Sequence, residues 1–150
     1  MKNVFLASDV ADFVTRINNL TPESQALWGK MNVGQMLAHC NVTYEMAYEN
    51  KHPKPNVFLR FILKLFVKKL VTTDAPYKKN SQTAPAFKIS DARQFDAEKQ
   101  RLLNYLQKTL ELGENYFEGK ESLSFGQLTS KEWNTMMSKH LDYHLSQFGV

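Results

Sequence analysis

The stretch Trp133-Asn-Thr-Met-Met-Ser-Lys-His140-Leu-Asp-Tyr-His144-Leu-Ser-Gln-Phe148 has the periodicity of a single amphipathic helix. His140 and His144 are four residues apart, so their imidazoles lie on one face of that helix, one turn apart. The same face carries the apolar side chains of the stretch, namely Trp133, Met136, Met137, Leu141 and Phe148. Both histidines therefore point toward the predicted core.

Two histidines at this spacing can chelate one transition metal, and His39 offers a third imidazole from a second predicted helix. If the two helices pack together, three nitrogen ligands converge and leave coordination positions open for water or substrate. The alternative is a set of core histidines with ordinary hydrogen bonds. Leu141 follows His140, where a zinc-protease helix has glutamate, so the pattern does not indicate that class. Pattern alone leaves both interpretations open.

The length of 150 residues and the 43% hydrophobic content predict one domain over residues 1–150, with a real core. Cys40 is the only cysteine, which rules out an internal disulfide and fits a reducing compartment. The N-terminal residues lack the shape of a secretory signal. We therefore expect a cytoplasmic protein of bacterial type.

Positive charge is concentrated in one segment of the chain, although the formal net charge is only +4. Residues 51–79 carry eight basic and one acidic side chain, whereas the segments on either side are weakly acidic. This distribution argues against a nucleic-acid-binding protein. It leaves open a local anionic partner.

The apolar periodicity predicts helices separated by two long connections, and no stretch has the sustained alternation of a strand. Ser8 and Asn32 are expected to cap the first two helices, and Thr129 with Glu132 forms a capping box for the last. Residues 72–89 are expected to be a long loop. The fold class is therefore all-α, and a helical bundle is the simplest way to pack these helices. The expected helices cover residues 9–19, 33–49, 56–71, 91–116 and 130–148.

The helix expected at residues 56–71 is very apolar, with Arg60, Lys64 and Lys68 on one water-facing ridge. It is too short and too charged to span a membrane. Its apolar surface fits packing in the bundle or a homodimer contact, and we favour these two interpretations. The alternative is contact with a lipid surface.

Other polar residues are less informative. Cys40 is expected to be a buried apolar side chain rather than a nucleophile, because free cysteine is commonly buried. His52 stands beside Pro53 and is expected to be solvated. Four side chains are conceivable acid–base groups or supports for a ligand, although the charged exterior of a helix is the simpler interpretation: Glu45, Glu49, Asp142 and Gln147.

Three stretches carry a resemblance to a known superfamily. They are Arg16–Met31, Asn32-Val-Gly-Gln-Met36-Leu-Ala-His39-Cys40, and Glu132–Gly149 with its two histidines. On these residues the chain resembles the DinB/YfiT-like superfamily of metalloenzymes, in a branch described only as a domain of unknown function. The resemblance is weakest across residues 50–90.

The resemblance implies a DinB-like antiparallel four-helix bundle, here with an extra short N-terminal helix and long connecting loops. It also implies a divalent metal, nickel or zinc, held by His39, His140 and His144. Relatives include thiol-dependent transferases and isomerases, so it suggests thiol transfer or hydrolysis on an unknown small molecule, with a low-molecular-weight thiol as a candidate cosubstrate. The alternative is a non-catalytic binding or stress-related module with a structural or vestigial metal site. Catalytic residues are not assigned.

Overall fold

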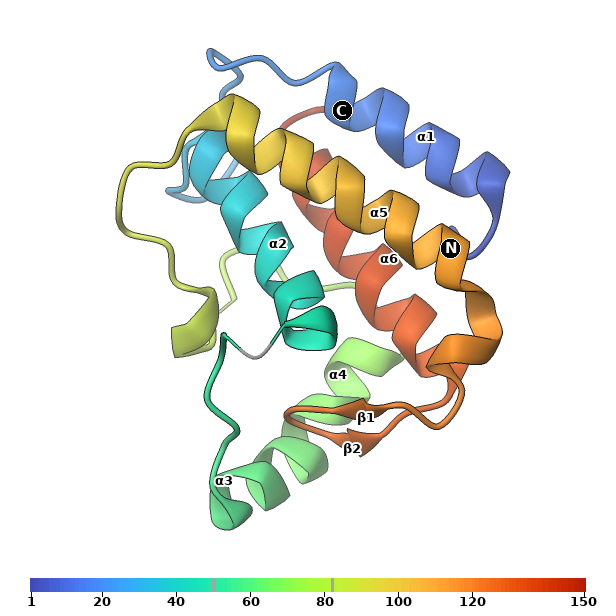
Figure 1. Ribbon diagram of the computed structural model, residues 1–150. Coiled ribbons are helices and arrows are strands. Elements are labelled where there is room, and N and C mark those ends of the chain that lie inside the picture. Colours follow the sequence, from blue (N-terminus) through green and yellow to red (C-terminus); the bar gives the residue numbers. More distant parts are fainter. Residues whose placement is uncertain (50, 82) are drawn as a thin grey trace.

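The computed structural model describes residues 1–49, 51–81 and 83–150, and it is mostly helical. Four helices, α1, α2, α5 and α6, pack around one core, and α5 runs across α2 and α6 (Figure 1). The shorter helices α3 and α4 lie at the lower end of the molecule beside a small hairpin (Figure 1). Their bounds are α1 Ala7–Asn18, α2 Val33–Tyr48, α3 Val57–Ile62, α4 Lys68–Thr72, α5 Phe95–Phe117 and α6 Ser130–Gln147.

Two further elements complete the helical segments. A π-helical segment, Leu63–Val67, joins α3 to α4, and a single 3-10 turn, Pro85–Phe87, lies in the loop before α5. The sequence did not predict the hairpin, in which β1 (Glu121–Ser122) pairs antiparallel with β2 (Gly126–Gln127). Strands of two residues are too short to show alternation. No helix in the described ranges has the length and apolarity needed to cross a bilayer.

Side-chain caps fix the starts of the two helices that carry the histidines. The Asn32 side chain accepts from the backbone of Gln35 at the start of α2, and Thr129 accepts from Glu132 at the start of α6. Both are reciprocal capping boxes, so both predicted starts are confirmed. Ser8 is not a cap, because α1 begins at Ala7, and Leu6 precedes it without a side-chain hydrogen bond.

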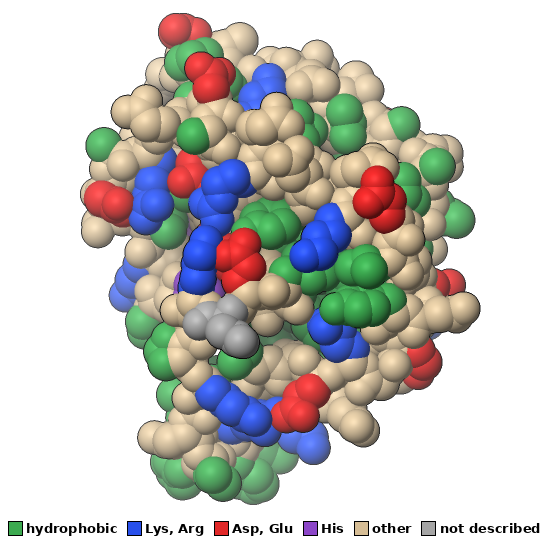
Figure 2. Space-filling model, in the orientation of Figure 1, with side chains coloured by type: hydrophobic (Ala, Val, Ile, Leu, Met, Phe, Trp, Pro, Cys, Tyr) green, Lys and Arg blue, Asp and Glu red, His purple; other side chains and the backbone are tan. Residues whose placement is uncertain are grey.

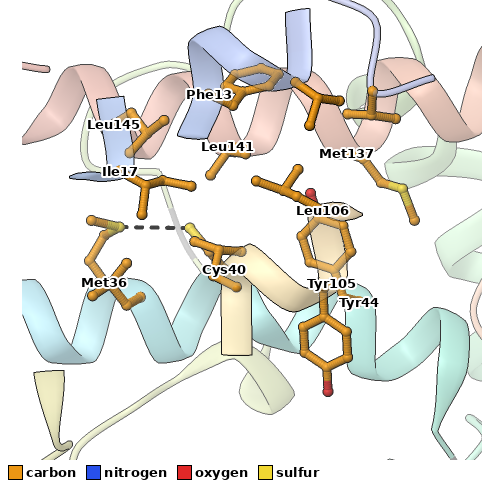
Figure 3. Close-up of a cluster of buried hydrophobic side chains, with 14 of the residues drawn as sticks. Phe13, Ile17, Met36, Cys40, Tyr44, Tyr105, Leu106, Met137, Leu141 and Leu145 are labelled. Atoms are coloured by element: carbon orange, nitrogen blue, oxygen red, sulfur yellow. Dashed lines mark hydrogen bonds between the residues drawn. The ribbon is translucent and has the colours of Figure 1, made fainter. Parts of the chain in front are cut away.

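The core lies between the four long helices and is built from the apolar faces that the periodicity indicated (Figure 3). Phe13 and Ile17 of α1 face Leu141 and Leu145 of α6, and all four are at most 1% exposed. Cys40 lies within this cluster and its Sγ is 3.7 Å from the Met36 Sδ (Figure 3). The prediction that Cys40 is a buried apolar residue is confirmed, and burial raises the pKa of its thiol.

The helix expected at residues 56–71 packs against the bundle only in part. Only one stripe of it, Leu63, Val67 and Val71, packs against the core. Arg60 and Lys68, expected to face water, instead pair with Glu121 and Glu132. The segment is apolar around most of its circumference, so periodicity could not identify the buried stripe, and the π-helical turn shifts the faces of its two ends.

Candidate metal centre

Three imidazoles meet between α2 and α6. His39 comes from α2, and His140 and His144 come from successive turns of α6. One nitrogen of each ring lies within 4.8 Å of the other two, and His39 Nε2 is 2.9 Å from His140 Nε2. Zinc–imidazole bonds of about 2.0–2.1 Å hold neighbouring ligand nitrogens roughly 3 Å apart. The three rings are therefore close enough together that they could hold one ion.

The backbone carbonyl of Phe87 fixes the proton of His39. That oxygen lies 2.8 Å from His39 Nδ1, and a carbonyl only accepts, so Nδ1 carries the hydrogen. In a neutral ring the lone pair is then on Nε2, the atom that faces His140. The 3-10 turn Pro85–Phe87 thus orients a nitrogen that is 48 residues away in the sequence.

The side-chain amide of Gln147 does the same for His144. Its Oε1 accepts from His144 Nδ1 at 2.8 Å, and its Nε2 donates to the Trp28 carbonyl at 2.6 Å. The second bond sets which end of the amide faces the histidine. Gly29 allows this approach: its φ is +86°, and a Cβ there would lie 2.5 Å from Gln147 Nε2. Gln147 is therefore not an exterior residue but a buried partner of a candidate ligand.

Thr43 completes the set by placing its Oγ1 3.1 Å from His140 Nδ1. A hydroxyl can donate or accept, so His140 has two arrangements. In one, His140 Nε2 donates to His39 Nε2 while Thr43 donates to Nδ1. In the other, His140 Nδ1 donates to Thr43, and all three rings keep a free lone pair on Nε2. The rings can therefore present three ligand atoms by moving one proton.

Burial keeps the three imidazoles neutral. Burial lowers the pKa of His39, although its bond to the Phe87 carbonyl opposes the shift. Burial, together with the two other histidines, lowers the pKa of His140 well below its ordinary value. The pKa of His144 falls to about 4, mainly through burial. Neutral imidazole is the form that binds a cation, so at pH 7 the cluster needs no net deprotonation to act as ligand.

Two aromatic rings flank the cluster. The Phe87 ring is 5.4 Å from the His39 ring and 5.7 Å from that of His140, and the Tyr143 ring is 5.0 Å from His144, centroid to centroid. Within the described ranges, neither a carboxylate nor a thiolate joins the three histidines. The ligand set offered here is three nitrogens, with an oxygen behind each ring and two aromatic rings beside them. Such a set suits zinc, nickel, iron and copper alike.

The residue before His140 anchors the neighbouring segment. Lys139 is only 8% exposed, and its Nζ donates to the carbonyls of Leu70, Thr73 and Ala75, each at 2.7 Å. The same ammonium lies 4.2 Å from the centre of the Tyr77 ring. This contact fixes the end of α4 and the start of the loop beside the cluster. This contact could not be predicted from the sequence, because a lysine in an amphipathic helix is normally exposed.

The other candidate residues lie apart from the cluster. Asp142 is exposed and pairs with Arg16 at 2.6 Å, as expected for a helix exterior. Glu45 is buried and pairs with Arg101 of α5 and with His52, whose Nε2 is 2.8 Å away. The expectation that His52 is solvated is therefore wrong. Glu49 is partly exposed and bonds to Lys51 and Tyr105.

The whole site lies within a stretch that matches one protein family. Residues 5–149 match the family described as "Protein of unknown function (DUF1569)". The chain belongs to this family. All three histidines and their oxygen partners are inside the matched range. No curated protein and no solved structure matches the chain. The family is thus established, while its description assigns no reaction.

Thr43 and Gln147 had a signal in the sequence. Thr43 is four residues after His39, and Gln147 is three residues after His144, so each shares a helix face with a ligand candidate. The Phe87 and Trp28 carbonyls had no such signal. Every residue has a backbone carbonyl, so the residue type does not reveal what that carbonyl contacts. From the sequence we therefore named the three histidines and considered Gln147, but missed Thr43.

Proposed function

We propose that this protein is a metal-dependent enzyme in which His39, His140 and His144 hold a divalent cation, zinc or nickel. The supporting observation is the combination of convergence and orientation: the three rings meet, and each Nδ1 contacts a separate oxygen. Metal-binding histidines characteristically donate their second N–H to such an oxygen. Ordinary core histidines do not need to turn three Nε2 atoms toward one point.

The proposal also places the protein in the DinB/YfiT-like superfamily, with the long helices forming its four-helix bundle. Support comes from the source of the ligands, since one histidine lies on α2 and two lie on the last helix, as the resemblance implies. The superfamily suggests thiol transfer or hydrolysis. Three protein ligands leave room for a substrate atom, which is the usual arrangement at catalytic rather than structural zinc.

A bound divalent cation would supply Lewis-acid chemistry, lowering the pKa of a water or thiol at an open coordination position. The protein's own groups bind and orient. Gln147 and the Phe87 carbonyl hold the protons of His144 and His39 on Nδ1. The Thr43 hydroxyl can accept a hydrogen bond from Nδ1 of His140 and so hold the His140 proton on Nδ1 as well. The rings of Phe87 and Tyr143 limit water around the ligand nitrogens.

Metal titration of the chelator-treated protein, by calorimetry with zinc and with nickel, tests the assignment. We expect one equivalent to bind wild type and at least about a hundredfold weaker binding in His140→Ala, because a protein ligand is lost. His52→Ala is the matched control, since that histidine pairs with Glu45 outside the cluster. Equal affinity of His140→Ala and wild type would refute the site.

Chelation separates the enzyme from the alternative, a binding module with a structural metal. An enzyme site should give an apo-protein that remains folded and melts within a few degrees of the metal-loaded form. A structural site should make the melting temperature depend strongly on chelator. Screens for thiol transfer and hydrolysis with the metal-loaded protein then assign the reaction. Loss of activity in His140→Ala, but not in His52→Ala, would connect the activity to the cluster.

A further inference from the structure

One end of the molecule exposes an unusual number of large apolar side chains. We call this surface the α3 tip; it consists of Val57, Phe58, Leu59, Phe61, Leu65, Phe66 and Leu70, each 46–88% exposed. Figure 2 shows apolar side chains gathered at the lower end, where α3 lies, with basic side chains directly above them. Together these side chains present on the order of 600–800 Å² of apolar surface, more than a typical monomer leaves in water.

The apolar residues of the α3 tip are spread around the helix rather than aligned. At about 100° per residue within α3, Val57, Phe61, Phe58 and Leu59 alone sweep through roughly 200° of the circumference. A seam against a partner helix needs a stripe about 100° wide. A wide apolar arc on a projecting helix instead fits a medium that surrounds the helix, such as the upper part of a lipid bilayer.

The charge beside the α3 tip is positive. Residues 51–73 contain six lysines and arginines and no acidic residue. Three acids of the body, Glu49, Glu121 and Glu132, pair with four of these cations. Lys64 and Lys69 are exposed, and neither makes an ion pair within the described residues. An excess of positive charge therefore remains.

This excess distinguishes between two partners. Two copies of the chain meeting through the α3 tip would bring their unneutralised lysines together, which is unfavourable. A bilayer with anionic headgroups would neutralise them, and each lysine near such a surface contributes about 1 kcal/mol of attraction.

We infer that the α3 tip docks the protein on anionic membrane surfaces, with the phenylalanines in the headgroup–acyl boundary and Lys64 and Lys69 at the lipid phosphates. The helix lies on the bilayer, in agreement with the lack of a spanning helix in the described ranges. Aromatic and basic side chains on one short helix are the usual composition of such peripheral anchors.

Flotation of the full chain with phosphatidylcholine vesicles, with and without phosphatidylglycerol, tests the inference. We expect binding only when phosphatidylglycerol is present, and weaker binding as salt rises. Phe61→Ser/Phe66→Ser should lower the partition coefficient at least about tenfold, because both rings leave the lipid. Lys64→Gln/Lys69→Gln should also lower it, whereas Lys30→Gln/Lys88→Gln removes the same charge elsewhere and should not. All the substituted residues are exposed, and circular dichroism checks that each variant is folded.

Three outcomes would overturn the inference. Absence of wild-type binding to phosphatidylglycerol vesicles is the first, and equal binding to neutral vesicles is the second, because it removes the role of charge. The third is a wild-type dimer in light scattering that Phe61→Ser/Phe66→Ser converts to monomer, which would assign the α3 tip to a second copy. None of these measurements depends on metal binding.

Discussion

His39 Nε2 lies 2.9 Å from His140 Nε2, although the two residues are 101 positions apart in the chain. Two lone pairs at this distance repel each other unless a proton or a cation lies between them. The Thr43 hydroxyl allows either, because it can donate to His140 Nδ1 or accept from it. A proton shared between the two nitrogens therefore satisfies the contact, and the same pair could hold an ion.

Replacing Gln147 by leucine should weaken metal binding without removing a ligand. His144 would lose the oxygen that holds its proton on Nδ1, and such losses typically cost 10–100-fold in affinity. Zinc titration by calorimetry measures the change. Gln107→Leu, on the exposed side of α5, is the matched control and should bind as wild type does. Unchanged affinity in Gln147→Leu would show that the amide has no supporting role.

Thr43→Val tests the third oxygen with a side chain of nearly the same shape. The valine leaves His140 Nδ1 without a partner, so we expect roughly tenfold weaker zinc binding and little change in the far-ultraviolet spectrum. Thr43→Ser keeps the hydroxyl and should restore most of the affinity. A serine variant as weak as the valine variant would indicate that packing, rather than the hydroxyl, matters here.

Stability of the metal-free protein should fall as the pH is lowered from 7.5 to 5.5. Burial depresses the pKa of His39, His140 and His144 in the folded state, that of His144 to about 4. The unfolded chain titrates near the ordinary histidine value of about 6.5, so it binds more protons in this range. The stabilisation is complete above that value and disappears toward the folded pKa values. Urea midpoints in the presence of chelator measure the effect, and a midpoint that stays constant or increases toward acid would contradict it.

Lys139→Met should destabilise the fold by about 1–3 kcal/mol, because three carbonyl oxygens lose a charged donor while the side-chain length is kept. Lys131→Met, an exposed lysine of the same helix, should change the free energy of unfolding by less than about 0.5 kcal/mol. Urea denaturation measures both. Hydrogen exchange should also accelerate in residues 70–77 of Lys139→Met alone, and equal exchange in both variants would refute the anchoring role.

The helices and ligand candidates were predictable because they depend on local pattern. The capping boxes at Asn32 and Thr129, and the inward faces of His140 and His144, follow from spacing along one helix. The exposed side of α3 was not predictable, because an almost uniformly apolar segment does not reveal which stripe is buried. Lys139 and the Phe87 carbonyl were also beyond reach, because both act through contacts with distant backbone.

The oxygen that orients His39 belongs to the main chain of Phe87, so the site tolerates substitutions there better than insertions or deletions nearby. Exchanging the side chain at position 87 alters the neighbouring ring but leaves the accepting oxygen in place. Adding or deleting a residue in the preceding loop would move that oxygen away from the imidazole. Selection for the site should therefore act on the length of this loop more strongly than on its composition.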